Sequence, residues 1–163
     1  MKSRGRVNSN VGQPGMIEES SHNLRRPRND GEWRAYHAIR REVLFENRGC
    51  VDIYNENHPD ELENGNHPLI LVDGGVPVGV IRVDVRDQVA WFRRVAVRQD
   101  LQRAGHGKRL LDLAETFARK NNCSEARSNV AAGAVGFYLR CGYSTDLSTA
   151  ADAQSILMFK RLV

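Results

Sequence analysis

The stretch that decides the fold is Val95-Ala-Val-Arg-Gln-Asp-Leu-Gln-Arg-Ala-Gly-His-Gly-Lys-Arg-Leu-Leu111. It reads as an apolar strand and a short polar turn, followed by Gln102-x-x-Gly105-x-Gly107 at the start of an amphipathic helix. The first N–H groups of a helix have no intrahelical acceptor, and the helix dipole adds partial positive charge there. Glycines lack a Cβ atom, so an anion can approach those groups closely. The stretch therefore predicts a turn that binds phosphate.

A second motif lies downstream, where Phe137-Tyr-Leu-Arg-Cys-Gly-Tyr143 places a tyrosine and then a helix-ending glycine. Either motif alone is common. In this order, separated by one helix and one short strand, the two closely resemble the GNAT superfamily of acyl-CoA-dependent N-acetyltransferases. That family carries Gln/Arg-x-x-Gly-x-Gly/Ala after its fourth strand. A later helix commonly carries Ala-x-x-Phe-Tyr-x-x-x-Gly-Phe/Tyr, which Ala134, Phe137, Tyr138, Gly142 and Tyr143 match. The resemblance is strong over Pro68–Tyr143, extends back to Asn29 and is absent before it.

The resemblance implies an α/β (α+β) fold with one mixed sheet. An antiparallel meander is followed by a β-α-β unit, the central strands splay apart, and helices cover both faces. The residue pattern supports this order. Asn29 and Glu32 form a capping box at the start of a helical stripe that reaches Leu44, and Gly79 indicates a bulge or a close backbone approach. The other predicted strands are 24–28, 69–73, 76–85, 88–97, 125–130 and 155–162, and the other predicted helices are 106–122 and 132–141.

The family resemblance also implies a cofactor, acetyl-CoA, and a set of residues that bind it. The pantetheine arm would pair with the backbone of the fourth strand like an added strand. The pyrophosphate would lie on the glycine turn, and a branched side chain at Gly107 would block it. Tyr138 would be the general acid that protonates the departing thiolate. The implied cofactor-binding residues are Val95, Ala96, Val97, Gln102, Arg103, Ala104, Gly105, His106, Gly107 and Lys108.

The chain departs from the family pattern at one catalytic position. Trp91 stands where many relatives carry a glutamate base, so no direct base is carried over. Asp84, Glu46, Asp52 and His58 are candidates for a base that acts through water. Two hypotheses follow. The first is an N-acetyltransferase acting on a primary amine of a small molecule or peptide; the second is a non-catalytic acyl-CoA-binding or regulatory module.

Length and composition favour a single domain. The chain has 163 residues, of which 40% are hydrophobic and 27% charged, and its formal net charge is +4. Residues 1–28 hold six basic and two acidic side chains, so the remaining residues balance to zero. We expect 1–23 to be a disordered leader, with Met16 a candidate start, and 24–163 to form one GNAT-like domain. A basic tail on a neutral body argues against nucleic-acid binding, and no apolar run has the length of a membrane helix.

The cysteines and histidines exclude some other chemistry. Three cysteines without a Cys-x-x-Cys pair predict neither a disulfide framework nor a zinc site, and they fit a cytoplasmic location. The five histidines lack metal-ligand spacing, so no metal is expected. The expected partners are therefore acetyl-CoA and an amine acceptor, without nucleic acid or membrane. A homodimer is compatible with the sequence.

Overall fold

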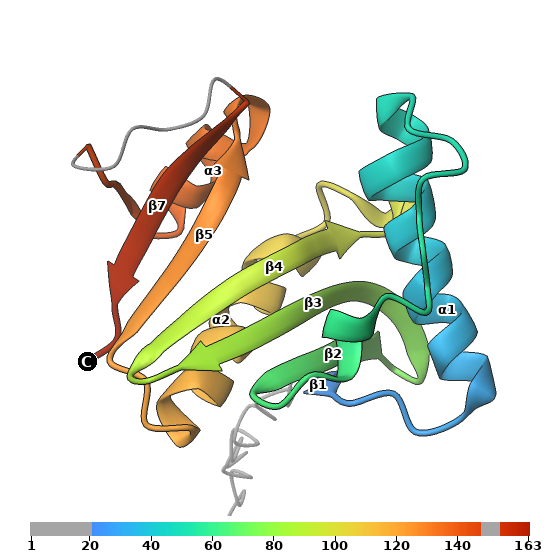
Figure 1. Ribbon diagram of the computed structural model, residues 1–163, viewed down its shortest axis with the longest axis horizontal. Coiled ribbons are helices and arrows are strands. Elements are labelled where there is room, and N and C mark those ends of the chain that lie inside the picture. The colour runs from blue at the N-terminus through green and yellow to red at the C-terminus, as the bar shows by residue number, and fades with distance from the viewer. Residues whose placement is uncertain (1–20, 148–153) are drawn as a thin grey trace, which may run out of the picture.

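A seven-stranded mixed sheet forms the centre of the protein (Figure 1). The computed structural model describes residues 21–147 and 154–163. The strand order is β1-β2-β3-β4-β5-β7-β6, in which β4 and β5 are parallel and every other neighbouring pair is antiparallel. The strands are β1 (His22–Arg25), β2 (Asn66–Asp73), β3 (Val76–Arg86), β4 (Val89–Val97), β5 (Glu125–Ala131), β6 (Ser144–Thr145) and β7 (Ser155–Arg161).

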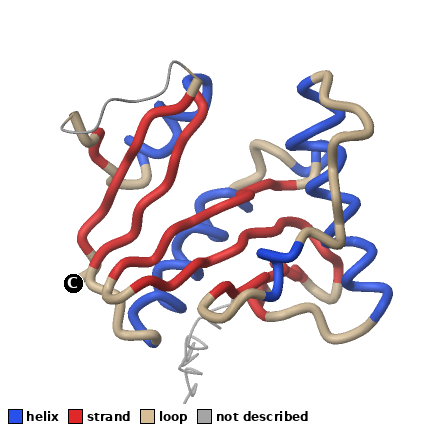
Figure 2. Tube along the Cα trace, in the orientation of Figure 1, coloured by secondary structure: helices blue, strands red, loops and turns tan. Residues whose placement is uncertain are grey.

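Helices cover both faces of the sheet, and Figure 2 shows the two layers on either side of the strands. The α-helices are α1 (Asp30–Arg40), α2 (His106–Lys120) and α3 (Val135–Arg140). A π-helical turn, η1 (Arg41–Phe45), continues α1, and short 3-10 turns follow at η2 (Glu46–Arg48), η3 (Pro59–Leu62), η4 (Gln99–Leu101) and η5 (Ala132–Ala134). No helix of the described residues is long and apolar enough to span a bilayer.

Alternation along the strands produces two cores, one on each face. In β2, Leu69 and Leu71 pack in the cluster that includes the buried stripe of α2, whereas Ile70 and Val72 pack with α1. All four side chains are buried. Tyr36 and Ile39 are the buried residues through which α1 joins the second core. The mixed sheet covered on both faces confirms the fold class that the sequence predicts.

A one-residue bulge changes the face that β4 presents. Arg82 of β3 pairs with Arg93, but Val80 pairs with Ala96, so β4 holds one extra residue there. Arg94 carries this irregularity, with a left-handed φ of 55°. As a result Phe92 belongs to the α2 core and Ala96 to the α1 core, although residues four positions apart share a face in a regular strand.

Several local predictions are confirmed. The Asn29 side chain accepts a hydrogen bond from the Glu32 N–H at 2.9 Å, as in a capping box. The Glu32 carboxylate, however, binds the N–H of Arg28 and the guanidinium of Arg25. A Cβ atom at Gly79 would lie 3.1 Å from the Ala96 carbonyl oxygen, so the backbones do approach closely.

The elements differ from the predicted ones in several places. The first strand begins at His22, inside the expected leader, and ends at Arg25. The predicted helix 132–141 divides into η5 and α3. The short strand β6, which pairs with β7, was not predicted. The remainder of the expected leader, residues 1–20, lies outside the described residues.

Candidate active site

The central strands β4 and β5 separate after a short paired segment (Figure 1). Parallel pairing covers only Val89 to Trp91 on β4, opposite Glu125 to Arg127 on β5. Just beyond it, the Ser128 hydroxyl donates a hydrogen bond to the carbonyl oxygen of Phe92 at 2.9 Å. From there to Val97, β4 has no ladder partner on its β5 side among the described residues. A strand with such an open side can accept an extended ligand.

A cavity of about 1090 Å³ occupies this opening. Its lining comes from the splayed strands, the start of α2 and the beginning of α3. Residues of the loop before β2 also line it. Of the residues predicted to bind cofactor, eight line it, namely Val95, Ala96, Val97, Gln102, Arg103, Gly105, Gly107 and Lys108. Ala104 and His106 are not among its lining residues.

The turn before α2 has the shape that the glycine pattern predicts. Gly105 caps the helix with a left-handed φ of 86°, and Arg103 has a φ of 64°. The Gln102 side-chain amide donates to the Val97 carbonyl oxygen at 3.1 Å, which ties the turn to the end of β4. Lys108 is exposed and pairs with Asp112 one turn along, which raises the pKa of Lys108. The first turn of α2 therefore offers its backbone N–H groups to the cavity.

Gly107 has a packing role besides the predicted one, and it does line the cavity. A Cβ atom there would lie 3.2 Å from Cζ of Phe137, so this glycine lets α2 and α3 approach each other. A valine at Gly107 would disturb that packing as well as any bound phosphate. Gly133 is the open position, because a Cβ atom on it would meet nothing within 4 Å, and it lines the cavity.

The His106 side chain points toward β1. Its Nδ1 lies 2.9 Å from Nε2 of His22, which in turn lies 3.7 Å from a carboxylate oxygen of Asp73. One ligand atom from each of these three residues lies within 4.8 Å of the others. Such a group could hold a metal ion, although no sequence spacing pointed to it, because the three residues come from three distant parts of the chain.

Tyr138 is the best-placed acid among the lining residues. It lies on α3, is 5% exposed and borders the cavity. Burial raises the pKa of Tyr138 above 10, and a hydrogen bond with Ser128 opposes that effect. The phenol is therefore protonated at neutral pH.

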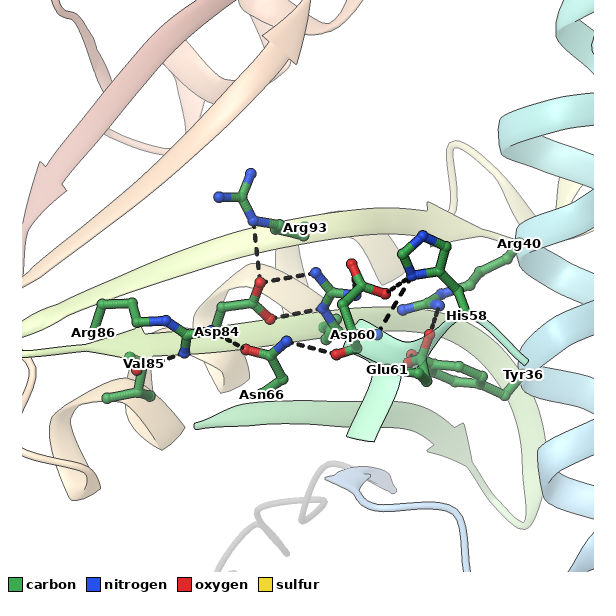
Figure 3. A network of polar contacts seen from close by, with 11 residues as sticks. Tyr36, Arg40, His58, Asp60, Glu61, Asn66, Asp84, Val85, Arg86 and Arg93 are labelled. Atoms are coloured by element: carbon green, nitrogen blue, oxygen red, sulfur yellow. Dashed lines mark hydrogen bonds and ion pairs between the residues drawn. The ribbon is translucent and has the colours of Figure 1, made fainter. Parts of the chain in front are cut away.

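A polar network forms the other end of the cavity (Figure 3). The buried Asp84 carboxylate accepts from Nε and Nη2 of Arg82 at 2.7 and 2.8 Å, and from Nε of Arg93 at 3.1 Å. Arg82 also pairs with Asp60 at 3.1 Å. Burial acts to raise the pKa of Asp60, but Arg82 and His58 outweigh it and hold that pKa below its usual value. Of the four candidate bases, Asp84 lines the cavity, and Glu46, Asp52 and His58 do not.

A second buried network fixes the loop that closes this end. Glu61 of η3 accepts hydrogen bonds from the Tyr36 hydroxyl and from Nη1 of Arg40, both on α1 (Figure 3). All three residues are buried, and burial raises the pKa of Tyr36 well above its usual value.

Trp91 does not line the cavity, and its ring lies 5.2 Å from the guanidinium carbon of Arg93.

Sequence reasoning missed several residues that line the cavity. They include Arg94 at the bulge and Ser128 on β5. Gly133 was not missed, because glycines 133 and 136 inside the predicted helix 132–141 indicate a close approach to the backbone, by a cofactor or by packing against the sheet, and Gly133 does line the cavity. Nothing local marks Arg94 or Ser128, because their positions depend on the bulge and on the separation of two strands.

Comparison with known proteins agrees with this geometry. Residues 29–143 match the model of the acetyltransferase (GNAT) family. The uncharacterized N-acetyltransferase YjcF of Bacillus subtilis is 30% identical over 105 residues, which are 64% of this chain and 73% of YjcF. Because the family model spans most of the chain, the protein belongs to the GNAT family, and by that membership it is an acetyltransferase.

Two solved structures share the fold. A crystal structure described as a putative N-acetyltransferase from Lactobacillus plantarum has a TM-score of 0.73 at 22% identity, covering 88% of this chain and 99% of the other. The PaiA N-acetyltransferase of Thermoplasma acidophilum, solved in complex with coenzyme A, has a TM-score of 0.67 at 19% identity, covering 86% and 99%. Both similarities concern the fold alone.

Proposed function

We propose that the protein transfers the acetyl group of acetyl-CoA to a primary amine in a ternary complex. One observation carries the proposal: the open side of β4, the start of α2 and the Tyr138 side of α3 border the same cavity. A donor of extended shape with an anionic end matches those three features. The coenzyme A in the crystals of the Thermoplasma relative supports that choice of donor.

The cofactor would lie along the splay. Its pantetheine arm would pair with backbone groups on the open side of β4 between Val95 and Val97, and its pyrophosphate would lie on the N–H groups of the turn from Gln102 to Lys108. The Val97 carbonyl oxygen already accepts from Gln102, so that oxygen is engaged by the protein itself. Side-chain charge adds less than the backbone here, because Lys108 is exposed and paired with Asp112.

The chemical step is direct attack. The neutral amine nitrogen forms a bond to the thioester carbonyl carbon, and the carbon–sulfur bond then breaks. A backbone N–H near Val97 would stabilise the developing oxyanion, and Tyr138 would donate its proton to the departing sulfur. The attacking nitrogen loses its extra proton to solvent through water, and Tyr138 regains a proton from solvent. Asp84 is a poor direct base, because three N–H groups of Arg82 and Arg93 already occupy its oxygens.

Release of CoA thiol over a panel of amines tests the proposal. The expected result is CoA release that depends on one class of amine, with the acetylated amine found by mass spectrometry. Tight acetyl-CoA binding without release for any amine would instead favour the non-catalytic acyl-CoA-binding module. Trp91, in place of a glutamate base, is the feature that keeps this second hypothesis open.

The cofactor position has a separate test with a matched pair of glycine variants. Gly133→Leu places a side chain into open cavity space, so acetyl-CoA binding should weaken about tenfold or more while the domain stays folded. Gly136→Ala is the control, because Gly136 lies one helical turn along and does not line the cavity. Equal calorimetric affinities for the two variants would place the cofactor elsewhere.

The single domain over residues 24–163, the cytoplasmic location, the homodimer and the absence of nucleic-acid partners stay predictions. Size-exclusion chromatography with light scattering decides the homodimer. Limited proteolysis followed by mass spectrometry decides the domain boundary at the N-terminal side.

A further inference from the structure

The end of the cavity that holds the Asp84 network lies away from the glycine turn, and we call it the acceptor end. It carries an excess of positive charge. Five arginines line it, namely Arg48, Arg82, Arg86, Arg93 and Arg94, against three carboxylates. Two of those carboxylates are already neutralised inside the protein, since Asp84 binds Arg82 and Arg93, and Asp60 binds Arg82. The third, Glu63, is exposed. The excess therefore is not balanced by the described residues around it.

Arg94 is the arginine of this group that is best placed to bind a ligand in the cavity. It is the bulge residue of β4, immediately beyond the Arg93 that Asp84 holds. No carboxylate among the described residues pairs with Arg94, and the contact that its guanidinium makes is with the ring of Phe45, 5.2 Å away. Desolvation lowers the pKa of Arg94 and the neighbouring Arg40 and Arg82 lower it further, while Asp60 and Tyr54 oppose them only in part. The surroundings of Arg94 therefore favour the binding of a further anion.

Arg93 offers further donors at the same place. Its Nε is bound to Asp84, and Figure 3 shows the rest of its guanidinium reaching away from the network, with no dashed contact at the two terminal nitrogens. A planar guanidinium matches a carboxylate through two parallel hydrogen bonds. The cavity is unfavourable for polycationic amines. Two of the carboxylates that would bind them, Asp60 and Asp84, are already paired with arginine, and the third, Glu63, is exposed.

We infer that the acceptor is an amine that also carries a carboxylate, as a free amino acid does, and that Arg94 binds this carboxylate in the cavity. The inference rests on the proposed function, because it names the substrate class of the same site. Positive surroundings also favour the neutral form of a substrate amine. The cavity therefore assists the loss of the amine proton without a carboxylate base at the position of Trp91.

The test compares free amino acids with their α-amides, which keep the amine and lose the negative charge. The wild-type protein should acetylate at least one amino acid with a lower KM than its amide. Arg94→Asn should raise the KM for the amino acid about 10- to 100-fold with little change in kcat, and leave the KM for the amide unchanged. Asparagine tolerates the left-handed φ of 55° at this position, so the variant isolates the charge. Arg94→Lys should restore part of the lost affinity.

Arg119→Gln is the control for general loss of positive charge. Arg119 lies on α2 outside the cavity and its guanidinium is 3.9 Å from Glu115. This variant should keep the wild-type KM for both compounds. An equal loss in Arg119→Gln and Arg94→Asn would overturn a specific role for Arg94.

The failure of this inference is distinguishable from failure of the proposed function. CoA release only with carboxylate-free amines overturns the inference and leaves the acetyltransferase proposal standing. If no amine releases CoA, the proposed function fails, and free amino acids are then titrated into the CoA-bound protein by calorimetry. Binding that Arg94→Asn abolishes supports the carboxylate subsite, and absence of binding overturns it.

Discussion

Ser128 of β5 reaches across to β4 and donates a hydrogen bond to the carbonyl oxygen of Phe92 at 2.9 Å, one residue past the end of the paired segment. The contact stands at the point where the two strands part. It satisfies a backbone oxygen that the separating ladder leaves behind, and the same side chain contacts Tyr138, whose pKa it acts to lower. One small side chain thus joins the splay to the predicted acid.

Ser128→Ala should destabilise the domain by about 1–3 kcal/mol, because the buried Phe92 oxygen loses its donor. The free energy of unfolding in urea measures the loss. Ser124→Ala, at an exposed position just before the same strand, should change it by less than about 0.5 kcal/mol. Equal stability of the two variants would mean that water replaces the Ser128 hydroxyl.

Tyr138→Phe should lower kcat by roughly 10²- to 10³-fold, while acetyl-CoA affinity and folding change little because the ring remains. Tyr143→Phe is the matched control. Tyr143 is also buried, but its hydroxyl donates to Glu115 at 3.1 Å and does not border the cavity. That variant should lose about 1 kcal/mol of stability and keep its kcat. Unchanged turnover in Tyr138→Phe would make Tyr138 a core aromatic residue.

Alkaline pH should unfold the protein before its tyrosines ionise. Burial raises the pKa of all four tyrosines, Tyr36, Tyr54, Tyr138 and Tyr143, above 10. Above about pH 10 the unfolded chain loses phenol protons that the folded one retains, so the free energy of unfolding falls as pH rises. For each of the three buried tyrosines the slope is about 1.4 kcal/mol per pH unit. Phenolate absorbance should therefore appear together with loss of circular dichroism, and a separate earlier step would contradict this.

Two N-terminal deletions should behave differently. Removal of residues 1–15 should leave the melting temperature and acetyl-CoA affinity nearly unchanged. Removal of residues 1–25 takes away β1, with the His22–His106 contact at the start of α2 and the ion pair of Arg25 with Glu32 at 2.7 Å. Each 1 kcal/mol lost should lower the melting temperature by about 2–4 °C. Acetyl-CoA affinity should fall too, because His106 neighbours the turn. Equal behaviour of the two deletions would show that β1 supports neither.

The sequence predicted most of the fold because its elements carry strong local signals. Period-2 and period-3.6 apolar patterns mark the meander and α2, and Asn29 caps α1 in the predicted way. Weaker elements were missed where tertiary contacts decide them. The two-residue strand β6 exists through its pairing with β7, and the π-helical turn after α1 has no signature in Arg41–Phe45.

The candidate site was predictable where a motif maps onto backbone geometry, as at Gly105. The orientation and packing of individual side chains in the motif were not predictable from the sequence. Both His106 and Gly107 lie in the motif, yet the ring of one points to His22 and the missing side chain of the other makes room for Phe137. Arg94 could not be identified either, since its position depends on an extra residue that appears only when β4 is placed in register with β3.

That extra residue divides β4 into two segments whose side-chain alternation is offset by one residue. Before the bulge, Phe92 packs toward α2; after it, Val95 and Val97 do so, while Ala96 faces α1. Strict alternation through a retained Arg94 would exchange the two faces for every residue that follows, sending Val95 and Val97 toward α1 and Ala96 toward α2, whereas deletion of Arg94 would remove the bulge and leave those faces unchanged. The bulge at Arg94 therefore keeps the apolar residues on both sides of it in phase with the two cores of the protein.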